Sequence, residues 1–184
     1  MARVGATGPL VSYTDLQQIP DEGRRYELYD GEVWVVPSPL PLHQVVLDRF
    51  GDRLKAYRQA AGGLVFFSPL DVVFSEFSTA QPDIFFFTLD RAHLIDLRQV
   101  IRVAPDLAAE VLSPSTTSID RGRKMKLYAQ HGVREYWLID PDLKRIEVCG
   151  LRDGMYAVVH VSTGAAAAVS GILPGFSVTA DSLF

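Results

Sequence analysis

Short apolar runs bounded by turn-forming residues occupy the middle of the chain. Ile84–Phe87, Leu107–Leu112 and Tyr136–Ile139 are each only four to six residues long. Pro82 stands before the first run and Pro114 follows the second. Runs of this length and with these borders are typical of buried strands rather than of helices. The chain is therefore expected to build a β-sheet.

Two β-hairpins are predicted from turn dipeptides. Asp30-Gly31 separates the strand-like segments Arg25–Tyr29 and Glu32–Val36, and Asp153-Gly154 leads into Met155–Val161. An Asp-Gly pair between two such segments is a strong hairpin signal, because both residues tolerate the left-handed backbone of a two-residue turn.

Two amphipathic helices are expected between the strands. In the first, apolar side chains recur at spacings of three and four, at Leu47, Phe50, Leu54, Tyr57 and Ala61. Gly62-Gly63 provides its end, and a second helix is predicted over Thr117–His131, with Gly132 after it.

The order of these elements is hairpin, helix, strands, helix, strands. It predicts an α/β (α+β) protein with a central mixed β-sheet flanked by α-helices and with additional β-hairpins. No linker divides the sequence, so we expect a single domain over residues 1–184, with residues 1–11 as a flexible N-terminal segment.

The composition excludes several classes of protein. Hydrophobic residues make up 48% of the 184 residues and charged residues 22%, which is a globular composition. No apolar run approaches the roughly 20 residues of a membrane span, so no membrane partner is expected. A single cysteine, Cys149, excludes an intrachain disulfide, and with no secretory-type segment it predicts a cytoplasmic protein. The net charge of −4 argues against broad nucleic-acid binding but leaves room for a local basic patch.

Acidic residues within two of the apolar strands are the strongest pointer to function. Asp83 opens Ile84–Phe87, and Glu110 lies within Leu107–Leu112. An ionised carboxylate there is costly to desolvate unless it is paired or binds a metal, and two adjacent carboxylates raise each other's pKa. Mg²⁺, which favours carboxylate oxygens and retained water, relieves both effects. The alternatives are a turn-capping Asp after Pro82 and an exposed strand Glu.

Further motifs surround these acids. They are Tyr26-Glu-Leu-Tyr-Asp-Gly-Glu32, Pro37-Ser-Pro39 with His43, Gln81-Pro-Asp-Ile84, Ala104-Pro-Asp-Leu107, Glu110-Val-Leu-Ser-Pro-Ser-Thr116, Asp120-Arg-Gly-Arg-Lys124, Tyr128, Gly132-Val-Arg-Glu-Tyr-Trp-Leu-Ile-Asp140 and Leu173-Pro-Gly-Phe176. In order and spacing they resemble the bacterial Uma-type family of proposed restriction endonucleases, formerly a domain of unknown function, within the PD-(D/E)xK nuclease superfamily. The resemblance begins at about Ser12 and covers nearly all of the remaining chain.

The resemblance implies a restriction-endonuclease-like core with a metal site at Asp83 and Glu110. The main-chain carbonyl of Val111 is a further candidate ligand. Mg²⁺ is the expected cofactor, with Mn²⁺ as a substitute. Such an ion activates water and neutralises charge that develops on phosphorus.

The chain departs from the superfamily pattern at the lysine. Leu112 stands two residues after Glu110, where the superfamily pattern has lysine. Lys124 on the following helix is the matching family position, and Lys126 is the fallback. The expected role is to orient the attacking water or to stabilise the phosphorane. The alternative is that Lys124 is one solvated charge among several on a helix surface.

Three other side chains are candidates for supporting roles. Glu27 matches a family position in the first hairpin and is expected to add an oxygen ligand, directly or through water, or else to be a surface glutamate on an edge strand. His43 precedes the long helix and is expected to contact phosphate or move a proton, or else to cap the helix. Tyr128 lies four residues after Lys124 on the same helix face, where it either positions the lysine or packs in the core.

The function expected from these residues is Mg²⁺-dependent endonuclease hydrolysis of DNA phosphodiester bonds. The candidate phosphate contacts form a local basic rim, comprising Arg24, Arg25, Arg121, Arg123 and Lys126. A homodimer is expected, because one small core has to reach both strands of a duplex. The alternative is a catalytically inactive nuclease fold that acts as a nucleic-acid-binding or assembly module.

Overall fold

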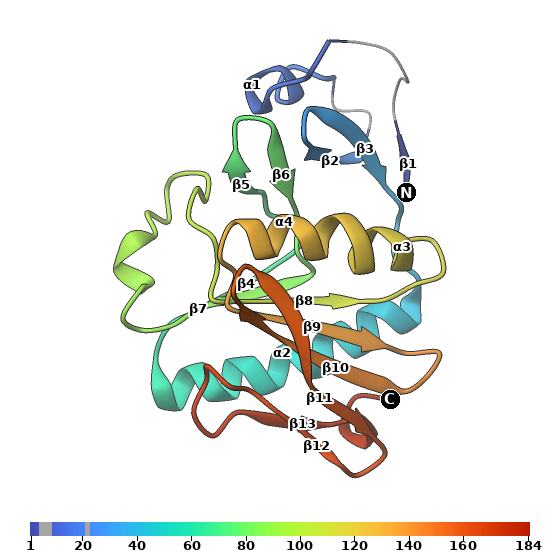
Figure 1. Cartoon of the computed structure of the whole chain (residues 1–184), viewed down its shortest axis with the longest axis vertical. Helices are drawn as coiled ribbons and strands as arrows, with labels where there is room; N and C mark the ends of the chain where they lie inside the picture. The colour runs from blue at the N-terminus through green and yellow to red at the C-terminus, as the bar shows by residue number, and fades with distance from the viewer. Residues whose placement is uncertain (4–8, 21–22) are drawn as a thin grey trace.

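The computed structural model describes residues 1–3, 9–20 and 23–184 (Figure 1). The helices are α1 (Tyr13–Leu16), α2 (Pro41–Ala61), α3 (Thr117–Ile119) and α4 (Met125–Gln130), with a π-helical segment at Asp120–Lys124 and 3-10 turns at Ala92–Leu94 and Ala180–Ser182. The strands are β1 (Ala2–Arg3), β2 (Arg25–Tyr29), β3 (Glu32–Val36), β4 (Leu64–Phe67), β5 (Val72–Ser75), β6 (Ser78–Ala80), β7 (Ile84–Phe87), β8 (Leu107–Val111), β9 (Glu135–Asp140), β10 (Arg145–Arg152), β11 (Met155–Thr163), β12 (Ala167–Val169) and β13 (Ser177–Thr179).

A mixed six-stranded sheet forms the centre of the molecule, in the order β11-β10-β9-β8-β7-β4. Strands β8 and β9 run parallel, while the other neighbours are antiparallel. The parallel pair requires a crossover, which the helical stretch from α3 to α4 provides. The predicted α+β class with a mixed central sheet is confirmed.

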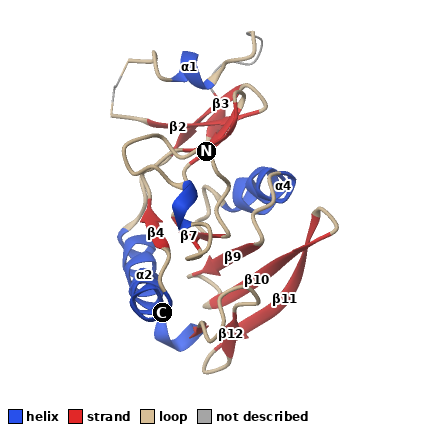
Figure 2. Cartoon of the chain, turned by 90° about the vertical axis from the view of Figure 1, so that its left-hand side faces the viewer, coloured by secondary structure: helices blue, strands red, loops and turns tan. Residues whose placement is uncertain are grey.

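Helices cover both faces of the middle of the central sheet, α2 on one side and α4 on the other, whereas the edge strand β11 is largely exposed (Figure 2). Phe50 of α2 packs on Trp137 of β9, with ring centroids 5.4 Å apart. On the opposite face Tyr128 of α4 packs on Tyr136, the neighbouring β9 residue, at 5.1 Å. Because neighbouring strand residues point to opposite faces, both faces of β9 are apolar, as its uninterrupted apolar run requires.

A second sheet, in the order β1-β3-β2-β6-β5, lies beside the first and contains the predicted hairpin. Asp30 and Gly31 take φ angles of 50° and 78°, as a two-residue turn between β2 and β3 requires. The other Asp-Gly pair, at 153–154, has the same angles and joins β10 to β11. Both hairpins are therefore confirmed. A third, two-stranded sheet of β12 and β13 completes the chain.

The helices differ from prediction in two details. Helix α2 begins at Pro41, before the first residue of the periodic pattern, because proline suits the first turn of a helix. The helix predicted over Thr117–His131 is confirmed as a helical stretch from Thr117 to Gln130, but its middle, Asp120–Lys124 with Gly122 at the centre, is π-helical and lies between α3 and α4. Glycine is a weak helix former, and local π geometry is often found at functional sites.

The prediction that residues 1–11 form a flexible segment can be compared with the structure only at residues 1–3 and 9–11. Ala2–Arg3 pair with β3, whereas residues 4–8 of the predicted flexible segment 1–11 lie outside the described residues. Within the described part of the chain, none of the helices combines the length and apolar character that a bilayer crossing demands.

Candidate active site

Adjacent strands bring the two predicted metal ligands together. Asp83 immediately precedes β7, Glu110 lies in β8, and the register pairs Ile84 with Ala109. The Asp83 N–H donates to Glu110 Oε2 at 3.4 Å, and the Val111 N–H donates to Asp83 Oδ2 at 2.8 Å. Two acids that are 27 residues apart in the sequence are thus neighbours at one end of the strand pair.

Lys124 carries its ammonium into this acidic site. Its side chain is only 6% exposed, and Nζ lies 3.0 Å from Glu110 Oε1 and 3.4 Å from both Glu27 Oε1 and Asp120 Oδ1. The alternative of a solvated helix charge is therefore wrong for this residue. Lys126, the fallback, is exposed and contributes to a different, smaller pocket.

Glu27 is fully buried in β2, between β3 and β6, and is not a surface residue of an edge strand. Its Oε2 accepts from the Tyr29 hydroxyl at 2.7 Å, and its Oε1 accepts from the Gln81 N–H at 2.8 Å. With Lys124 at 3.4 Å, these contacts make Glu27 a partner of the lysine.

His43 and Tyr128 each contact one of the two acids. His43 Nε2, in the first turn of α2, lies 2.9 Å from Asp83 Oδ2, while its buried Nδ1 has no hydrogen-bond partner. The hydroxyl of Tyr128, which is completely buried, donates to Glu110 Oε1 at 2.8 Å. The two residues therefore fix the carboxylates from opposite faces of the sheet.

Asp120 also belongs to the site and was not among the predicted site residues. It is 2% exposed, and its Oδ1 makes no hydrogen bond but lies near the Lys124 ammonium. The four-residue spacing between Asp120 and Lys124 is a sequence signal for an ion pair on one helix face.

The electrostatics of the site are dominated by burial and by an excess of carboxylates. Burial raises the pKa of Glu110 well above its usual range despite the attraction of Lys124, and burial raises the pKa of Asp120 to about 6. Although burial opposes its charge, Lys124 has its pKa raised by Glu110 and Glu27. For Asp83, burial is outweighed by the hydrogen bond and charge of His43, which lower the pKa. One ammonium therefore faces several carboxylates, and protons or a further cation have to compensate the remainder.

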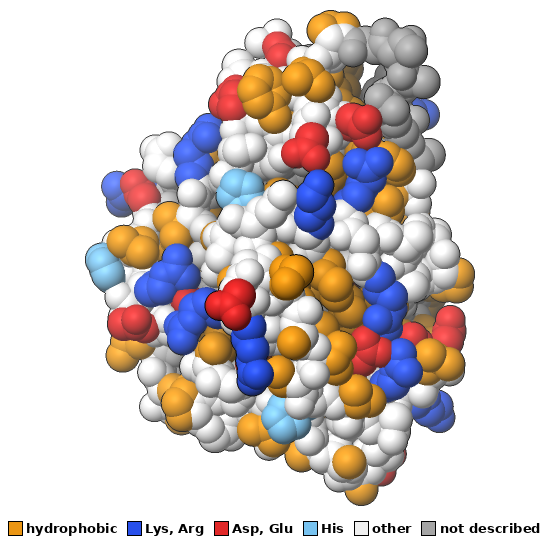
Figure 3. All heavy atoms as spheres, in the orientation of Figure 1, with side chains coloured by type: hydrophobic (Ala, Val, Ile, Leu, Met, Phe, Trp, Pro, Cys, Tyr) orange, Lys and Arg blue, Asp and Glu red, His pale blue; other side chains and the backbone are white. Residues whose placement is uncertain are grey.

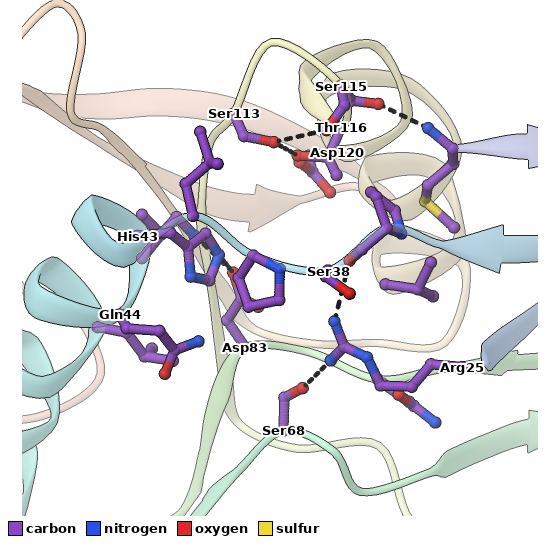
Figure 4. A pocket seen from close by; sticks show the side chains of 18 of the residues that line it. Arg25, Ser38, His43, Gln44, Ser68, Asp83, Ser113, Ser115, Thr116 and Asp120 are labelled. Carbon is purple, nitrogen blue, oxygen red and sulfur yellow. Dashed lines mark hydrogen bonds and ion pairs between the residues drawn. The ribbon is translucent and has the colours of Figure 1, made fainter. Parts of the chain in front are cut away.

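A cavity of about 530 Å³ opens beside these groups (Figure 4). Asp83, Val111, Asp120 and Lys124 line it, whereas Glu110 is not a lining residue and lies 3.0 Å from the Lys124 ammonium. Among the described residues, no hydrogen bond reaches Asp83 Oδ1, and Glu110 Oε2 accepts only the 3.4 Å contact from the Asp83 N–H, whereas Asp83 Oδ2 and Glu110 Oε1 are engaged. These oxygens and the open cavity fit a hard divalent cation that keeps several waters. Across the described ranges, no three His, Cys, Asp or Glu side chains converge on one point.

The predicted basic rim is divided in the structure. Arg25 lines the cavity, Arg121 forms a bidentate pair with Glu147 at 2.7 and 3.1 Å, and Arg123 stacks over Trp34 at 4.6 Å. Arg24 is exposed. Basic and acidic side chains are interspersed on the face shown in Figure 3. Of the four predicted arginines, only Arg25 is part of the cavity lining.

Comparison with known proteins yields a family and a fold. Residues 13–181 match the Uma2 family model, which is described as "Putative restriction endonuclease". A crystal structure from Anabaena variabilis, described as a "putative nuclease belonging to DUF820", superposes with a TM-score of 0.79 over 95% of this chain and 97% of that one, at 19% identity. No curated protein matches the chain. Because the family model spans almost the whole sequence, the chain belongs to the Uma2 family.

Proposed function

We propose that the protein is a Mg²⁺-dependent nuclease that hydrolyses phosphodiester bonds of DNA. The observation that carries this proposal is the buried Lys124 ammonium, which lies 3.0 Å from Glu110 and lines the same cavity as Asp83. Family membership and the fold of the Anabaena protein support a nuclease. Those comparisons do not assign the substrate, so DNA remains part of the proposal.

Asp83 and Glu110, with the Val111 carbonyl, would hold the cation, and water would fill its remaining positions. When bound, Mg²⁺ supplies activation of water and neutralisation of phosphate charge. A +2 charge also balances the carboxylate excess of the buried site. Mn²⁺ offers similar chemistry and is expected to substitute.

The chain's own residues would divide the remaining work. Lys124 lines the cavity, and there its ammonium would stabilise the negative charge of the pentavalent phosphorane. Glu27 and Asp120 hold the ammonium in place, and Tyr128 fixes the Glu110 carboxylate. His43 fixes Asp83 in the same way. These four act on the reacting groups through other side chains.

The proposal is tested by nicking of supercoiled DNA with Mg²⁺ or Mn²⁺. The wild-type protein should convert the plasmid to open circles, and Asp83→Asn, Glu110→Gln and Lys124→Met should each reduce the rate by about 100-fold or more. Asp48→Asn is the control, because Asp48 is an exposed carboxylate on the outer side of α2. Equal nicking by all of these variants would show a contaminating nuclease and would end the proposal.

A binding module without turnover is the second candidate. The absence, within the described residues, of three converging metal-ligating side chains favours it. A protein that binds DNA with Mg²⁺ present but does not nick it would establish this alternative.

The proposal includes a homodimer that places one site on each strand of a duplex. Analytical ultracentrifugation should give twice the mass of the 20.4 kDa chain. A monomer with duplex-cutting activity would contradict the dimer without affecting the site.

A further inference from the structure

The lining of the cavity includes a positively charged side chain, Arg25, to which the proposed reaction gives no role. Arg25, at the start of β2, lines the same cavity as Asp83 and Lys124. Its guanidinium donates to Ser68 Oγ at 2.8 Å and to the Pro37 carbonyl at 3.1 Å. In the part of the chain that the structure describes, no carboxylate lies within ion-pair distance of it, unlike Arg91, Arg121 and Arg123.

Both partners of Arg25 are neutral, so they orient the guanidinium without neutralising it. Ser68 follows β4 and Pro37 follows β3, and the two contacts use only part of the five N–H donors of an arginine. A fixed guanidinium with free donors suits a phosphate oxygen pair, which it can bind in bidentate fashion. Figure 4 shows the Arg25 side chain extending towards Ser68, with Asp83 just above Ser68 and His43 further to the left.

The beginning of α2 adds positive potential to the same cavity. Leu40 and His43 line it, and no side chain caps the helix at Leu40, so early N–H groups of this 21-residue helix have no side-chain acceptor. Such a terminus favours anions, although alone it would not define a site. The N-terminus of α2 and Arg25 thus add positive potential to a cavity whose other charged groups include the acids Asp83 and Asp120.

We propose that Arg25 forms a second phosphate subsite, which binds the phosphate next to the one that is hydrolysed. This inference rests on the proposed nuclease function and adds a residue that binds a second phosphate of the same strand. An isolated phosphodiester would occupy only the reacting end and would gain nothing from Arg25. Arg25 is thus the residue that selects a polynucleotide.

The test is binding of a fluorescent ten-nucleotide single-stranded DNA, measured by anisotropy with Ca²⁺ in place of Mg²⁺. A single strand is used because a duplex would add contacts to the phosphates of the second strand, and these would also contribute to the salt dependence of binding. Arg25→Gln should weaken binding about tenfold and should reduce the slope of log K against log salt by about 0.7, the value for one lost phosphate contact. Arg98→Gln, which removes an exposed arginine outside the cavity lining, should leave both quantities unchanged.

Two further variants separate charge from structure. Arg25→Lys keeps the charge and should keep the salt slope, while it loses affinity with the guanidinium fork. Ser68→Ala removes one of the two contacts that orient the guanidinium and should weaken binding two- to threefold. Because the charge of Arg25 remains, the slope of log K against log salt should stay unchanged. Both also serve if Arg25→Gln does not fold.

An unchanged slope in Arg25→Gln, an equal loss in Arg98→Gln, or a reduced slope in Ser68→Ala would each overturn the subsite. No binding by the wild-type protein would overturn it as well. Arg25-dependent binding without plasmid nicking by the wild-type protein would instead remove only the hydrolase proposal.

Discussion

Lys124 is the side chain on which the charge balance of the site depends. Its ammonium contacts Glu27, Glu110 and Asp120, and all four groups are almost completely buried. Removing one partner from a buried ionic group leaves uncompensated charge, which destabilises more strongly than losing a surface pair. The stability of the protein and its proposed activity therefore depend on the same residue.

Lys124→Met should lower the free energy of unfolding by about 3 kcal/mol at pH 8. The loss should be smaller at pH 5, because the carboxylates left without a partner can then take up protons. Urea unfolding at both pH values measures this difference. Lys126→Met is the matched control and should change stability by less than about 0.5 kcal/mol, since Lys126 is exposed. Equal losses for the two variants would contradict the assignment of Lys124.

Asp120 should make the metal-free protein less stable as the pH rises. Burial raises its pKa from 3.8 to about 6, so the folded protein binds this proton more tightly than the unfolded chain does. The stabilisation is complete below pH 3.8 and is lost as the pH rises to about 6, at up to about 1.4 kcal/mol per pH unit.

Urea unfolding in EDTA between pH 4 and pH 7 measures the contribution of Asp120. Asp120→Asn should reduce the slope of stability against pH, to which Glu110 with its raised pKa also contributes, whereas the exposed-site control Asp48→Asn should leave the slope unchanged. The same slope in Asp120→Asn as in the wild-type protein would place the titration elsewhere.

At the scale of elements, the sequence predicted the hairpins and the first long helix from local signals. Asp-Gly turns and a 3.6-residue apolar period act within a few residues, so they can be read without the fold. The π-helical segment between α3 and α4 was not predicted, because the local signals of the sequence do not distinguish it from an α-helix. The π-helical segment ends at Lys124, whose ammonium contacts Glu27 of β2 and Glu110 of β8, and these contacts are evident only in the folded structure.

The connection between α2 and β4 depends on Gly63. Its φ is +96°, and a Cβ there would lie 2.4 Å from the Phe87 carbonyl oxygen of the neighbouring strand. Gly63→Ala should therefore destabilise by about 3 kcal/mol, through strain and collision. Gly132→Ala has a positive φ of +78° but open space, and should cost only about 1 kcal/mol. Thermal melting compares the two, and equal losses would contradict the close approach.

For the whole molecule, the mixed central sheet and the pairing of Asp83 with Glu110 followed from the order of elements and the family resemblance. The sequence indicated less about the second sheet, whose Glu27 contacts Lys124 and accepts a hydrogen bond from the Gln81 N–H. Those contacts join segments more than 50 residues apart, and periodicity within a segment carries no information about them. Two further features also became evident only from the fold: the contact of Asp120 with Lys124, and the two neutral partners that hold the Arg25 guanidinium.

Divalent cation binding should stabilise the whole fold, because the acids meet only in the folded chain. Mg²⁺ at 100 times its Kd adds about 2.7 kcal/mol, which corresponds to a rise of about 5–10 °C in Tm. Asp83→Asn should abolish the rise and Asp48→Asn should preserve it. A rise that survives in Asp83→Asn would show that the ion binds elsewhere.

The most direct measurement is an anomalous difference map from a crystal soaked in Mn²⁺. We expect a peak about 2.1 Å from a carboxylate oxygen of both Asp83 and Glu110, on the cavity side of Lys124. A map with no peak there, or with Mn²⁺ bound only at surface carboxylates, would contradict the metal site and the proposed hydrolysis with it.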